Sequence, residues 1–423
     1  MVQNGTAWFG PIVAQQIRVG TGRFTPGDLV VLQVVPTGSD AISPNGAGMV
    51  LNNFSVSSLS TTFKVNLPVT GPDAIVTGSS PFTGMTDLSS DGNYIVVGGY
   101  NVVPPYTASV EVAGSPIPRA IGTINSAGQF VLNARTTTGF AGGTFRGVVS
   151  DGLGNFWGGA QNSGIYYFGN NFPAKQISPA GAGAIRNMIM VKGRPYFTTS
   201  QYPVAGNFGV AAFPSVAPTS PEEPSLVLDT GNNATGATGT ANPKGFYFNT
   251  NLTIAYVVDL RTAPSGGIYR YNGTGTGLAG SWTYAYTLTN NLFGNGGAFQ
   301  DVIVDFSGAN PKLYATAGSS ATGIAAGTNL VTAIDTGAAT TRFTLLATAA
   351  AGTAFRGLSF APKLVSLAIA RNGSNIVITW PGGGVLYSAS DVAGPYTPVD
   401  GSPTSPYTVS APSAAQFYAV GYP

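Results

Sequence analysis

Short runs in which hydrophobic and polar residues alternate recur along most of the chain, and turn residues separate them. Met85–Ser89, Tyr94–Gly98 and Phe130–Asn133 are typical, with Ser90-Asp91-Gly92-Asn93 as a hairpin signal between the first two. Alternation with a period of two residues is the pattern of a half-buried β-strand. No helical periodicity extends far enough to compete with it. The pattern therefore predicts an all-β protein.

The predicted strands group into units of four that repeat roughly every 40–60 residues, a period typical of solenoids and propellers. Five complete units are predicted, with first strands at Met85–Ser89, Phe145–Ser150, Ile185–Val191, Lys244–Phe248 and Gln300–Phe306. A direct sequence match supports the alignment, because Phe145-Arg146-Gly147-Val148 recurs as Phe355-Arg356-Gly357-Leu358.

The two ends of the repeat region complete each other. Phe355–Phe360 is a first strand without partners downstream, whereas Leu29–Val35, Met49–Val56 and Thr62–Leu67 are three strands without a first strand before them. Pairing them makes a sixth unit and seals a radial array, which leaves only short, protected edges. The sequence thus predicts a six-bladed β-propeller in which the N-terminal strands close the last blade.

The strand pattern changes at Lys363. Six short predicted strands follow, at Val365–Ala370, Asn375–Trp380, Val385–Ser388, Tyr396–Val399, Tyr407–Ser410 and Gln416–Val420. They indicate a small β-sandwich near the lower size limit for independent folding. The predicted organisation is an N-terminal extended segment over 1–26, the propeller over 27–362 and the sandwich over 363–423.

The C-terminal strands carry a family resemblance. The stretch with Ile376–Trp380, Pro395–Val399 and Gln416–Val420 resembles the fibronectin-type-III-like C-terminal modules of bacterial secreted proteins. The repeat region similarly resembles bacterial extracellular propellers of the NHL or Kelch type. These resemblances imply an extracellular binding or structural role and carry no catalytic residues across.

Charge changes the picture more than hydrophobicity does. Hydrophobic residues make up 43% of the chain, but charged residues only 8%, with a net charge of +2, against roughly a quarter charged in average soluble proteins. Low charge removes the repulsion that keeps proteins apart and favours self-association. The basic residues form no stripe, which argues against a nucleic-acid partner, and no run is long enough to span a membrane. We expect an extracellular or cell-surface location from the Thr/Ser/Asn/Gly-rich composition.

Two residue types are missing, and their absence limits the chemistry. The chain has neither His nor Cys, which excludes a Ser-His-Asp triad, a thiolate nucleophile and zinc held by His or Cys. We assign no catalytic residue, no metal and no cofactor, and expect no enzyme activity. A glycosidase could still use two carboxylates, but no pair of Asp can be placed from the sequence.

Aligning the first strands places long polar side chains at one level of the predicted ring. The equivalent residues are Arg146, Arg186, Lys244, Gln300 and Arg356, with Met85 in the remaining unit. Because first strands line the channel of a propeller, these basic residues would ring one mouth and favour an anion or an acidic glycan. The alternative is structural: each side chain caps carbonyls between blades or pairs with Asp87 or Asp301.

An apolar segment precedes the repeats. Its hydrophobic members are Trp8, Phe9, Ile12, Val13, Ile17 and Val19. They could add a strand to a neighbouring subunit, and a head-to-tail contact of that kind generates a filament. Packing along its own propeller is the alternative.

Three functional hypotheses follow. The leading one is an extracellular structural or adhesive protein that self-associates, as subunits of a filament or surface layer. The runner-up is a monomeric propeller that binds a glycan or another anion at the channel mouth. The third is an enzyme acting on polysaccharide.

Overall fold

A computed structural model of the chain describes residues 22–38, 40–112, 116–140, 143–169, 174–179, 184–200, 208–231, 238–261, 265–277, 280–292, 299–318, 328–364, 367–380, 385–401, 403–410 and 416–421. The regular structure within these ranges is β-strand throughout, so the all-β prediction is confirmed. The apolar N-terminal segment from Trp8 to Val19 lies outside the described residues. None of the described residues form a helix that could cross a membrane.

Within the described ranges, the strands form six four-stranded antiparallel sheets and two three-stranded ones. Five of the larger sheets each use four consecutive strands. The first has β4 (Thr86–Leu88), β5 (Ile95–Tyr100), β6 (Arg119–Ile124) and β7 (Phe130–Thr136), and the second has β8 (Phe145–Ser150), β9 (Phe156–Ala160), β10 (Gly164–Tyr167) and β11 (Lys175–Gln176). The third has β12 (Met188–Val191), β13 (Arg194–Thr199), β14 (Gly209–Ala212) and β15 (Ser225–Asp229). The fourth has β16 (Pro243–Phe248), β17 (Ile254–Asp259), β18 (Gly267–Gly273) and β19 (Trp282–Leu288), and the fifth has β20 (Phe299–Asp305), β21 (Lys312–Ala317), β22 (Asn329–Ile334) and β23 (Thr344–Thr348).

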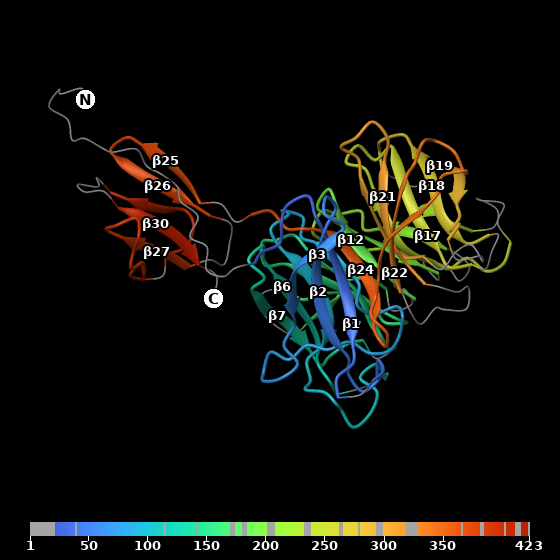
Figure 1. Cartoon of the computed structure of the whole chain (residues 1–423), viewed down its shortest axis with the longest axis horizontal. Coiled ribbons are helices and arrows are strands. Elements are labelled where there is room, and N and C mark those ends of the chain that lie inside the picture. The colour runs from blue at the N-terminus through green and yellow to red at the C-terminus, as the bar shows by residue number, and fades with distance from the viewer. Residues whose placement is uncertain are drawn as a thin grey trace.

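The sixth sheet joins the two ends of the repeat region, as the sequence predicts. It has the order β24-β1-β2-β3, where β24 is Ala354–Phe360, β1 is Leu29–Val35, β2 is Gly48–Ser55 and β3 is Ser60–Asn66. Strand β24 runs antiparallel to β1, with Val30 opposite Ser359 and Val34 opposite Ala354. Figure 1 shows the orange strand β24 directly beside the blue strand β1.

The first strands of successive sheets lie against one another around a common centre. β4 contacts β8, β8 contacts β12, β16 contacts β20, β20 contacts β24, and β24 returns to β4, while the third sheet reaches the fourth through β13 and β16. Four-stranded antiparallel sheets arranged in this way form a β-propeller. Hydrophobic side chains fill the spaces between neighbouring sheets.

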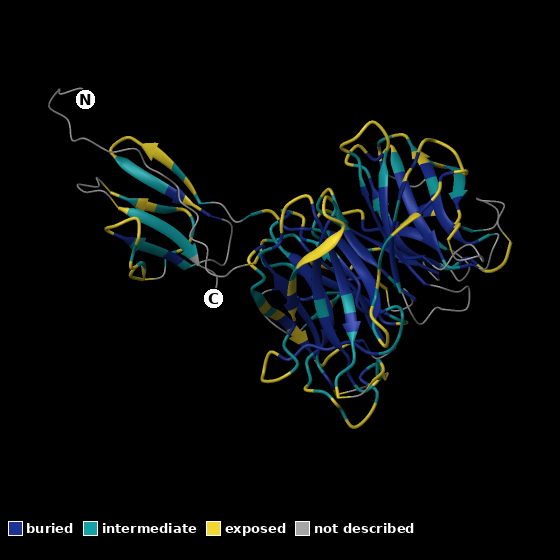
Figure 2. Ribbon diagram, in the orientation of Figure 1, coloured by how far each residue is buried: buried dark blue, intermediate teal, exposed yellow. Residues whose placement is uncertain are grey.

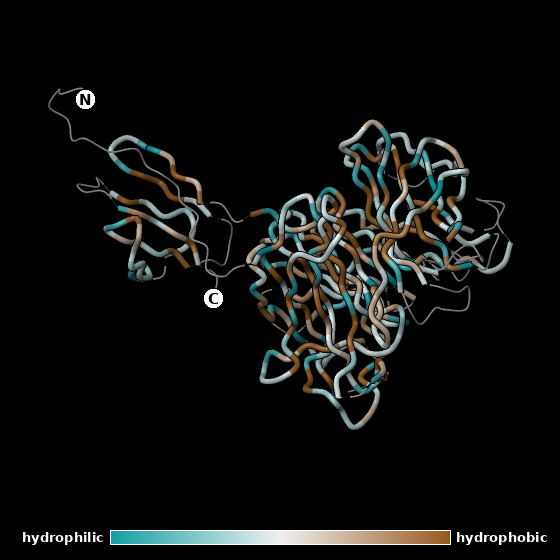
Figure 3. The backbone as a smooth tube through the Cα atoms, in the orientation of Figure 1, coloured by the Kyte–Doolittle hydropathy of each residue, from teal (hydrophilic) through white to brown (hydrophobic). Residues whose placement is uncertain are grey.

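Burial falls from the centre of the propeller outwards. Strands β8 and β5 are buried at every residue, whereas the fourth strand β3 is largely exposed. Figure 2 shows dark blue strands inside and yellow at β3 and in the loops. Hydrophobic segments likewise follow the strands, and the connecting loops are paler or hydrophilic (Figure 3). The mouth of the propeller is therefore built by the ends of buried, rigid strands.

The two three-stranded sheets come from the end of the chain. Their orders are β25-β26-β29 and β28-β27-β30, with β25 (Ala368–Asn372), β26 (Asn375–Thr379), β27 (Val385–Ala389), β28 (Thr397–Pro398), β29 (Tyr407–Val409) and β30 (Phe417–Gly421). Their fully buried core consists of Ile378, Trp380 and Leu386. In Figure 1 these strands stand apart from the propeller strands. Lys363, just before them, is tied to the β4–β5 hairpin, because its backbone N–H donates to the Gly92 carbonyl over 2.8 Å.

Candidate functional site

The long polar side chains aligned by sequence lie together at one mouth of the propeller. Four of them occupy the second position of their inner strand or its equivalent: Arg146 in β8, Lys244 in β16, Gln300 in β20 and Arg356 in β24. Arg186 lies two residues before β12, where the chain is held by the bond from its N–H to the Thr198 carbonyl (3.1 Å). Charge at this mouth is concentrated by the low-dielectric strands around it.

A phenylalanine from the loop before β4 fills the space between these side chains. The guanidinium carbon of Arg186 lies 4.5 Å from the centroid of the Phe82 ring, and that of Arg146 lies 4.8 Å from it. The Lys244 ammonium nitrogen is 5.5 Å from the same centroid. Cations at these distances are attracted to the face of an aromatic ring. Three basic residues from three different sheets therefore share one ring.

The rest of this loop is held by hydrogen bonds from the basic side chains. We call residues 79–83 the plug loop. Arg356 donates to the carbonyls of Ser79 (3.1 Å), Ser80 and Thr83 (3.1 Å). Lys244 donates to the Pro81 carbonyl and to the Gln300 amide oxygen, each over 2.6 Å. The backbone carbonyls of the plug loop thus act as ligands for two cations.

A carboxylate completes the plug. Glu111 accepts hydrogen bonds from the Ser80 backbone N–H at 3.0 and 3.2 Å and from the Thr83 hydroxyl at 3.3 Å. A side chain on Gly78 would collide with Glu111, so the glycine permits this approach. At the other end of the loop, Gly84 has a φ of +75°, in the left-handed region that favours glycine.

Arg146 is partnered by its own surroundings. It donates to the Thr144 hydroxyl (2.8 Å), the Gln161 amide oxygen (2.7 Å) and the Ile185 carbonyl of the next sheet (3.2 Å). Carbonyl capping between blades was the structural alternative raised from the sequence, and it describes Arg146 and Arg356. The salt bridges among the described residues, Arg261–Asp259 and Arg270–Asp335, join no ring side chain to Asp87 or Asp301. The charge of Asp301 nevertheless opposes the lowering of the Lys244 pKa.

Among the described residues of the ring, Arg186 has two buried donors without a hydrogen bond, whereas Arg356 has one, its Nε. The two Arg186 donors are Nε and Nη1. Buried polar groups in folded proteins are nearly always hydrogen-bonded, so an unpaired cationic donor calls for an explanation. Arg186 is also half-buried, whereas Arg146, Lys244, Gln300 and Arg356 are buried.

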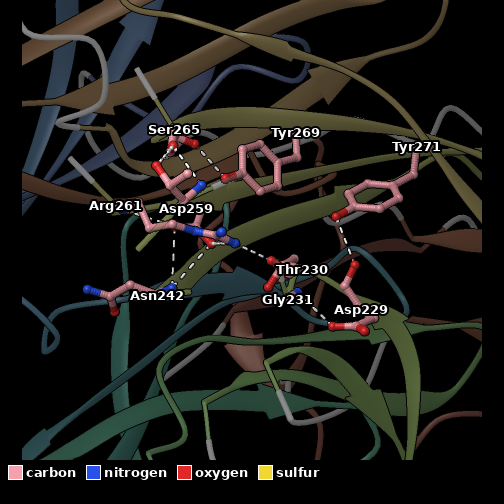
Figure 4. Close-up of polar contacts among 10 residues, drawn as sticks. Asp229, Thr230, Gly231, Asn242, Asp259, Arg261, Ser265, Tyr269 and Tyr271 are labelled. Atoms are coloured by element: carbon pink, nitrogen blue, oxygen red, sulfur yellow. Dashed lines mark hydrogen bonds and ion pairs between the residues drawn. The ribbon is translucent and has the colours of Figure 1, made fainter. Parts of the chain in front are cut away.

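The carboxylate that acts on the charge of Arg186 is Asp259, which already forms a salt bridge with another arginine. Asp259, which opposes the lowering of the Arg186 pKa, forms a buried salt bridge with Arg261, with 3.1 Å between Oδ1 and Nε. Figure 4 shows this pair with the Asn242 backbone N–H donating to the Asp259 carboxylate and Arg261 reaching Thr230. The pair is internally neutral, so it leaves the positive charge of Arg186 largely uncompensated.

The arginines of the mouth stay charged at neutral pH. Burial lowers the pKa of Arg146 to about 9 and those of Arg186 and Arg356 to about 10. Burial, together with the neighbouring Arg356, lowers the Lys244 pKa well below its usual range. The mouth is positive because of its arginines.

Directly below this ring the channel is closed. Glycine alternates with a polar residue around the six inner strands, in the order Thr86, Gly147, Asn187, Gly245, Asp301 and Gly357. Each glycine makes room for its neighbour, since a Cβ on Gly245 would lie 2.6 Å from the Asp301 Cα, and one on Gly357 would lie 2.5 Å from the Thr86 nitrogen. The amide of Asn187 donates to Asp301 across this layer (3.2 Å).

A cavity of about 30 Å³ lies below the closed layer, lined in part by Asp87 and Asp301. Burial raises the pKa of Asp87 to about 8, and it raises that of Asp301 as well. Backbone donors hold both carboxyls: the Met190 N–H reaches Asp87 over 3.0 Å, and the Leu358 N–H reaches Asp301 over 2.9 Å. The structure thus supplies the Asp pair that the sequence does not locate. The cavity has room for roughly one or two water molecules and none for a sugar ring.

The carboxylates of the hairpin turns serve the turns themselves. Asp91 accepts from the Ser89 hydroxyl (2.6 Å) and the Asn93 N–H (3.1 Å), and Asp151 accepts from the Leu153 N–H (2.8 Å). These are the local bonds that favour Asp in turns.

Phe82 and Glu111, the two side chains that occupy the mouth, were not predicted from the sequence. Neither belongs to a strand or a repeat motif. One signal was available for each: Gly78 and Gly84 flank the plug loop, and Glu111 is one of only three glutamates in the chain.

Comparisons with known proteins place no family name on the chain. No protein-family model matches it, and no curated protein does. The solved structures similar to it include a nidogen/laminin complex, at 12% identity and a TM-score of 0.46, covering 78% of this chain and 98% of that one. A putative 6-phosphogluconolactonase from Bacteroides fragilis NCTC 9343 has 13% identity and a TM-score of 0.41, covering 92% and 98%. An auxiliary nutrient binding protein from Bacteroides ovatus ATCC 8483 has 13% identity and a TM-score of 0.41, covering 78% and 80%. Likeness at this level says nothing about ligand or activity.

Proposed function

We propose that this chain is a non-catalytic binding protein, a six-bladed β-propeller with a C-terminal β-sandwich of the fibronectin type III kind, whose mouth binds an acidic ligand. The observation that carries the proposal is Arg186, a charged guanidinium with two buried nitrogens that lack a hydrogen-bond partner among the described residues. A carboxylate, sulfate or phosphate would accept a charge-assisted hydrogen bond from either nitrogen, and the two nitrogens offer their N–H groups on different edges of the guanidinium.

The surroundings of Arg186 support an anion in particular. Arg146 and Arg356 lower the Lys244 pKa, so their positive charges act on the same small volume. Among the described side chains near them, Glu111 opposes that charge, acting on both Arg146 and Arg356. An anionic ligand would gain from the remaining positive field. The composition leads us to propose an extracellular or cell-surface location and a carboxylated glycan as the ligand.

A titration with tetragalacturonate tests the proposal. The wild-type protein should bind it, with affinity falling as salt is added because the attraction is between charges. Arg186→Met should reduce affinity at least tenfold without loss of stability, since it removes a buried cation that has no partner. The matched control is Arg135→Met, which removes an exposed arginine from the outer strand β7. Equal affinity of the wild type and R186M would contradict the site.

Self-association is a second candidate, and the C-terminal sheets favour it. Strand β25 is a sheet edge with four of its five residues exposed, and the buried core cluster among the described residues of this unit is small, consisting of Ile378, Trp380 and Leu386. Exposed edges are templates for pairing with another chain. The strand-exchange hypothesis itself concerns residues outside the described ranges and stays a prediction. Sedimentation of the full chain beside one lacking residues 1–25 tests it, and a monomer at every concentration in both samples would contradict it.

A further inference from the structure

The mouth already contains an occupant that belongs to the chain itself. Phe82 presents its ring to Arg146, Arg186 and Lys244. Glu111 presents a carboxylate that opposes the charge of Arg146 and Arg356. The backbone of residues 79–83 presents carbonyl oxygens to Arg356 and Lys244. Ring face, carboxylate and several acceptor oxygens converge on one cluster of cations.

We propose that the plug loop with Glu111 is a built-in ligand, which an external carboxylated sugar displaces when it binds to Arg186 and its neighbours. This inference rests on the function proposed above and adds the regulation of that site and the chemistry of its ligand. A hexuronic acid unit offers a carboxylate and a set of hydroxyl and ring oxygens. Its carboxylate takes the place of Glu111 in the charge balance, and its saturated ring fills the volume of Phe82 while its oxygens supply the hydrogen-bond acceptors that an aromatic ring lacks.

The unpaired atoms of Arg186 fit this arrangement. A ring face attracts a cation but accepts no strong hydrogen bond from it, so Phe82 covers the guanidinium without satisfying its N–H groups. Arg146, by contrast, donates hydrogen bonds to the oxygen atoms of Thr144 and Gln161. The plug is therefore well bonded at Arg356 and poorly bonded at Arg186. An incoming carboxylate gains its new hydrogen bonds at Arg186, beneath Phe82.

The attachment of the loop fits displacement as well. Gly78 and Gly84 stand at its two ends, and Gly84 takes a left-handed conformation. Besides the ring cations, Glu111 holds the loop through the Ser80 N–H and the Thr83 hydroxyl, and the Thr77 hydroxyl donates to the Thr83 hydroxyl over 2.8 Å. Burial raises the Glu111 pKa, and this desolvation would be relieved when the loop leaves. Two variants weaken the plug from different sides: Phe82→Ala removes the ring, and Glu111→Gln removes the charge.

The test is calorimetric titration of the full chain with tetragalacturonate. A ligand that must first displace an internal occupant binds only the molecules in which the site is open. Its apparent Kd is therefore the intrinsic Kd divided by the open fraction. Phe82→Ala and Glu111→Gln should therefore each bind at least tenfold more tightly than the wild type. Adding Arg186→Met to either variant should abolish the gain. Thermal melts of each variant show whether the substitution unfolds the protein. If F82A does not fold, E111Q still tests the proposal.

The outcomes separate the two proposals. Equal affinity of the wild type, F82A and E111Q for tetragalacturonate would show that the plug loop does not compete with the ligand. The proposed binding site at Arg186 would still stand. No binding by the wild type or by either opened variant would overturn the proposed function itself. F82A and E111Q could also bind more tightly than the wild type and keep that affinity when Arg186→Met is added. The ligand would then bind away from Arg186, and the proposed displacement of the plug loop would be wrong.

Discussion

The guanidinium of Arg186 lies over the ring of Phe82, with 4.5 Å between its central carbon and the ring centroid, and two of its nitrogens have no hydrogen-bond partner among the described residues. A cation covered by an aromatic ring is held but not hydrogen-bonded. This relationship distinguishes Arg186 from Arg356, whose guanidinium donates to three carbonyls of the plug loop. The mouth thus combines an arginine that holds the carbonyls of the plug loop with one that has two buried nitrogens without a hydrogen bond among the described residues.

Arg356→Met should destabilise the protein strongly. The side chain is 1% exposed, and its removal takes the charged donor from the carbonyls of Ser79 and Thr83, while the Ser80 carbonyl keeps the N–H and hydroxyl of Thr83. Buried acceptors that lose a charged partner make the free energy of unfolding fall by about 3 kcal/mol. Urea denaturation measures it, with Arg135→Met as a control expected within about 0.5 kcal/mol of the wild type. A small effect in both variants would mean that Arg356 does not hold the plug loop.

Gly245→Ala should also destabilise the fold, because the added methyl group would lie 2.6 Å from the Cα of Asp301 in the layer that closes the channel. Overpacking against backbone lowers the free energy of unfolding by about 1–3 kcal/mol. Gly308→Ala is the matched control, since its Cβ would meet only a backbone oxygen at an ordinary 3.5 Å. Equal melting temperatures of the two variants would contradict the claim that the glycines of this layer leave no room for a side chain.

Asp87→Asn should change how stability depends on pH. Burial raises the Asp87 pKa from 3.8 to about 8, so between these values the folded state binds more protons than the unfolded state. The free energy of unfolding of the wild type therefore decreases as pH rises from about 4 to about 8. The asparagine cannot ionise, although its amide oxygen can still accept from Met190.

The stability of Asp87→Asn relative to the wild type should accordingly increase across this range. Urea denaturation at several pH values measures the difference, with the exposed Asp40→Asn as a control that keeps a constant offset from the wild type. A constant offset for Asp87→Asn as well would show that this carboxyl titrates alike in both states.

A disulfide can test the seam between the chain ends. Val34 and Ala354 face each other across β1 and β24 and are fully buried, and the natural chain has no cysteine. Directly opposite residues in antiparallel strands lie at a separation that a disulfide can bridge. Val34→Cys with Ala354→Cys should form the bond on oxidation and raise the free energy of unfolding by about 2–4 kcal/mol. Mass spectrometry and thiol labelling report it, beside the single Val34→Cys variant. Two free thiols after oxidation of the folded protein would contradict the pairing.

The strands could be predicted from the sequence because alternation and turn residues are local signals. Strands β1 and β8 have the predicted bounds, and the seam follows from counting strands at the two ends. Strand β12 begins later than predicted, at Met188. The chain before it is irregular because the Asn187 N–H donates to the Thr198 hydroxyl rather than continuing the ladder.

The site could be predicted only in part. Aligning the inner strands placed Arg146, Arg186 and Arg356 at one level because their positions follow the repeat. The occupant of the mouth could not be found in this way. Phe82 and Glu111 belong to connections outside the repeat, and what brings them to the mouth is three-dimensional: the approach of Glu111 to Gly78 and the convergence of three sheets on one ring.

The central claim, that the plug loop gives way to a ligand bound at Arg186, is tested most directly at the Phe82 ring. With 4-fluorophenylalanine placed at position 82 alone, ¹⁹F NMR should show one resonance at a frequency set by the surrounding cations. Tetragalacturonate should move that resonance to the frequency of a solvent-exposed ring in the wild-type background, and should leave it unmoved in the Arg186→Met background. A resonance that stays in place while the wild-type protein is saturated with the sugar would contradict the claim.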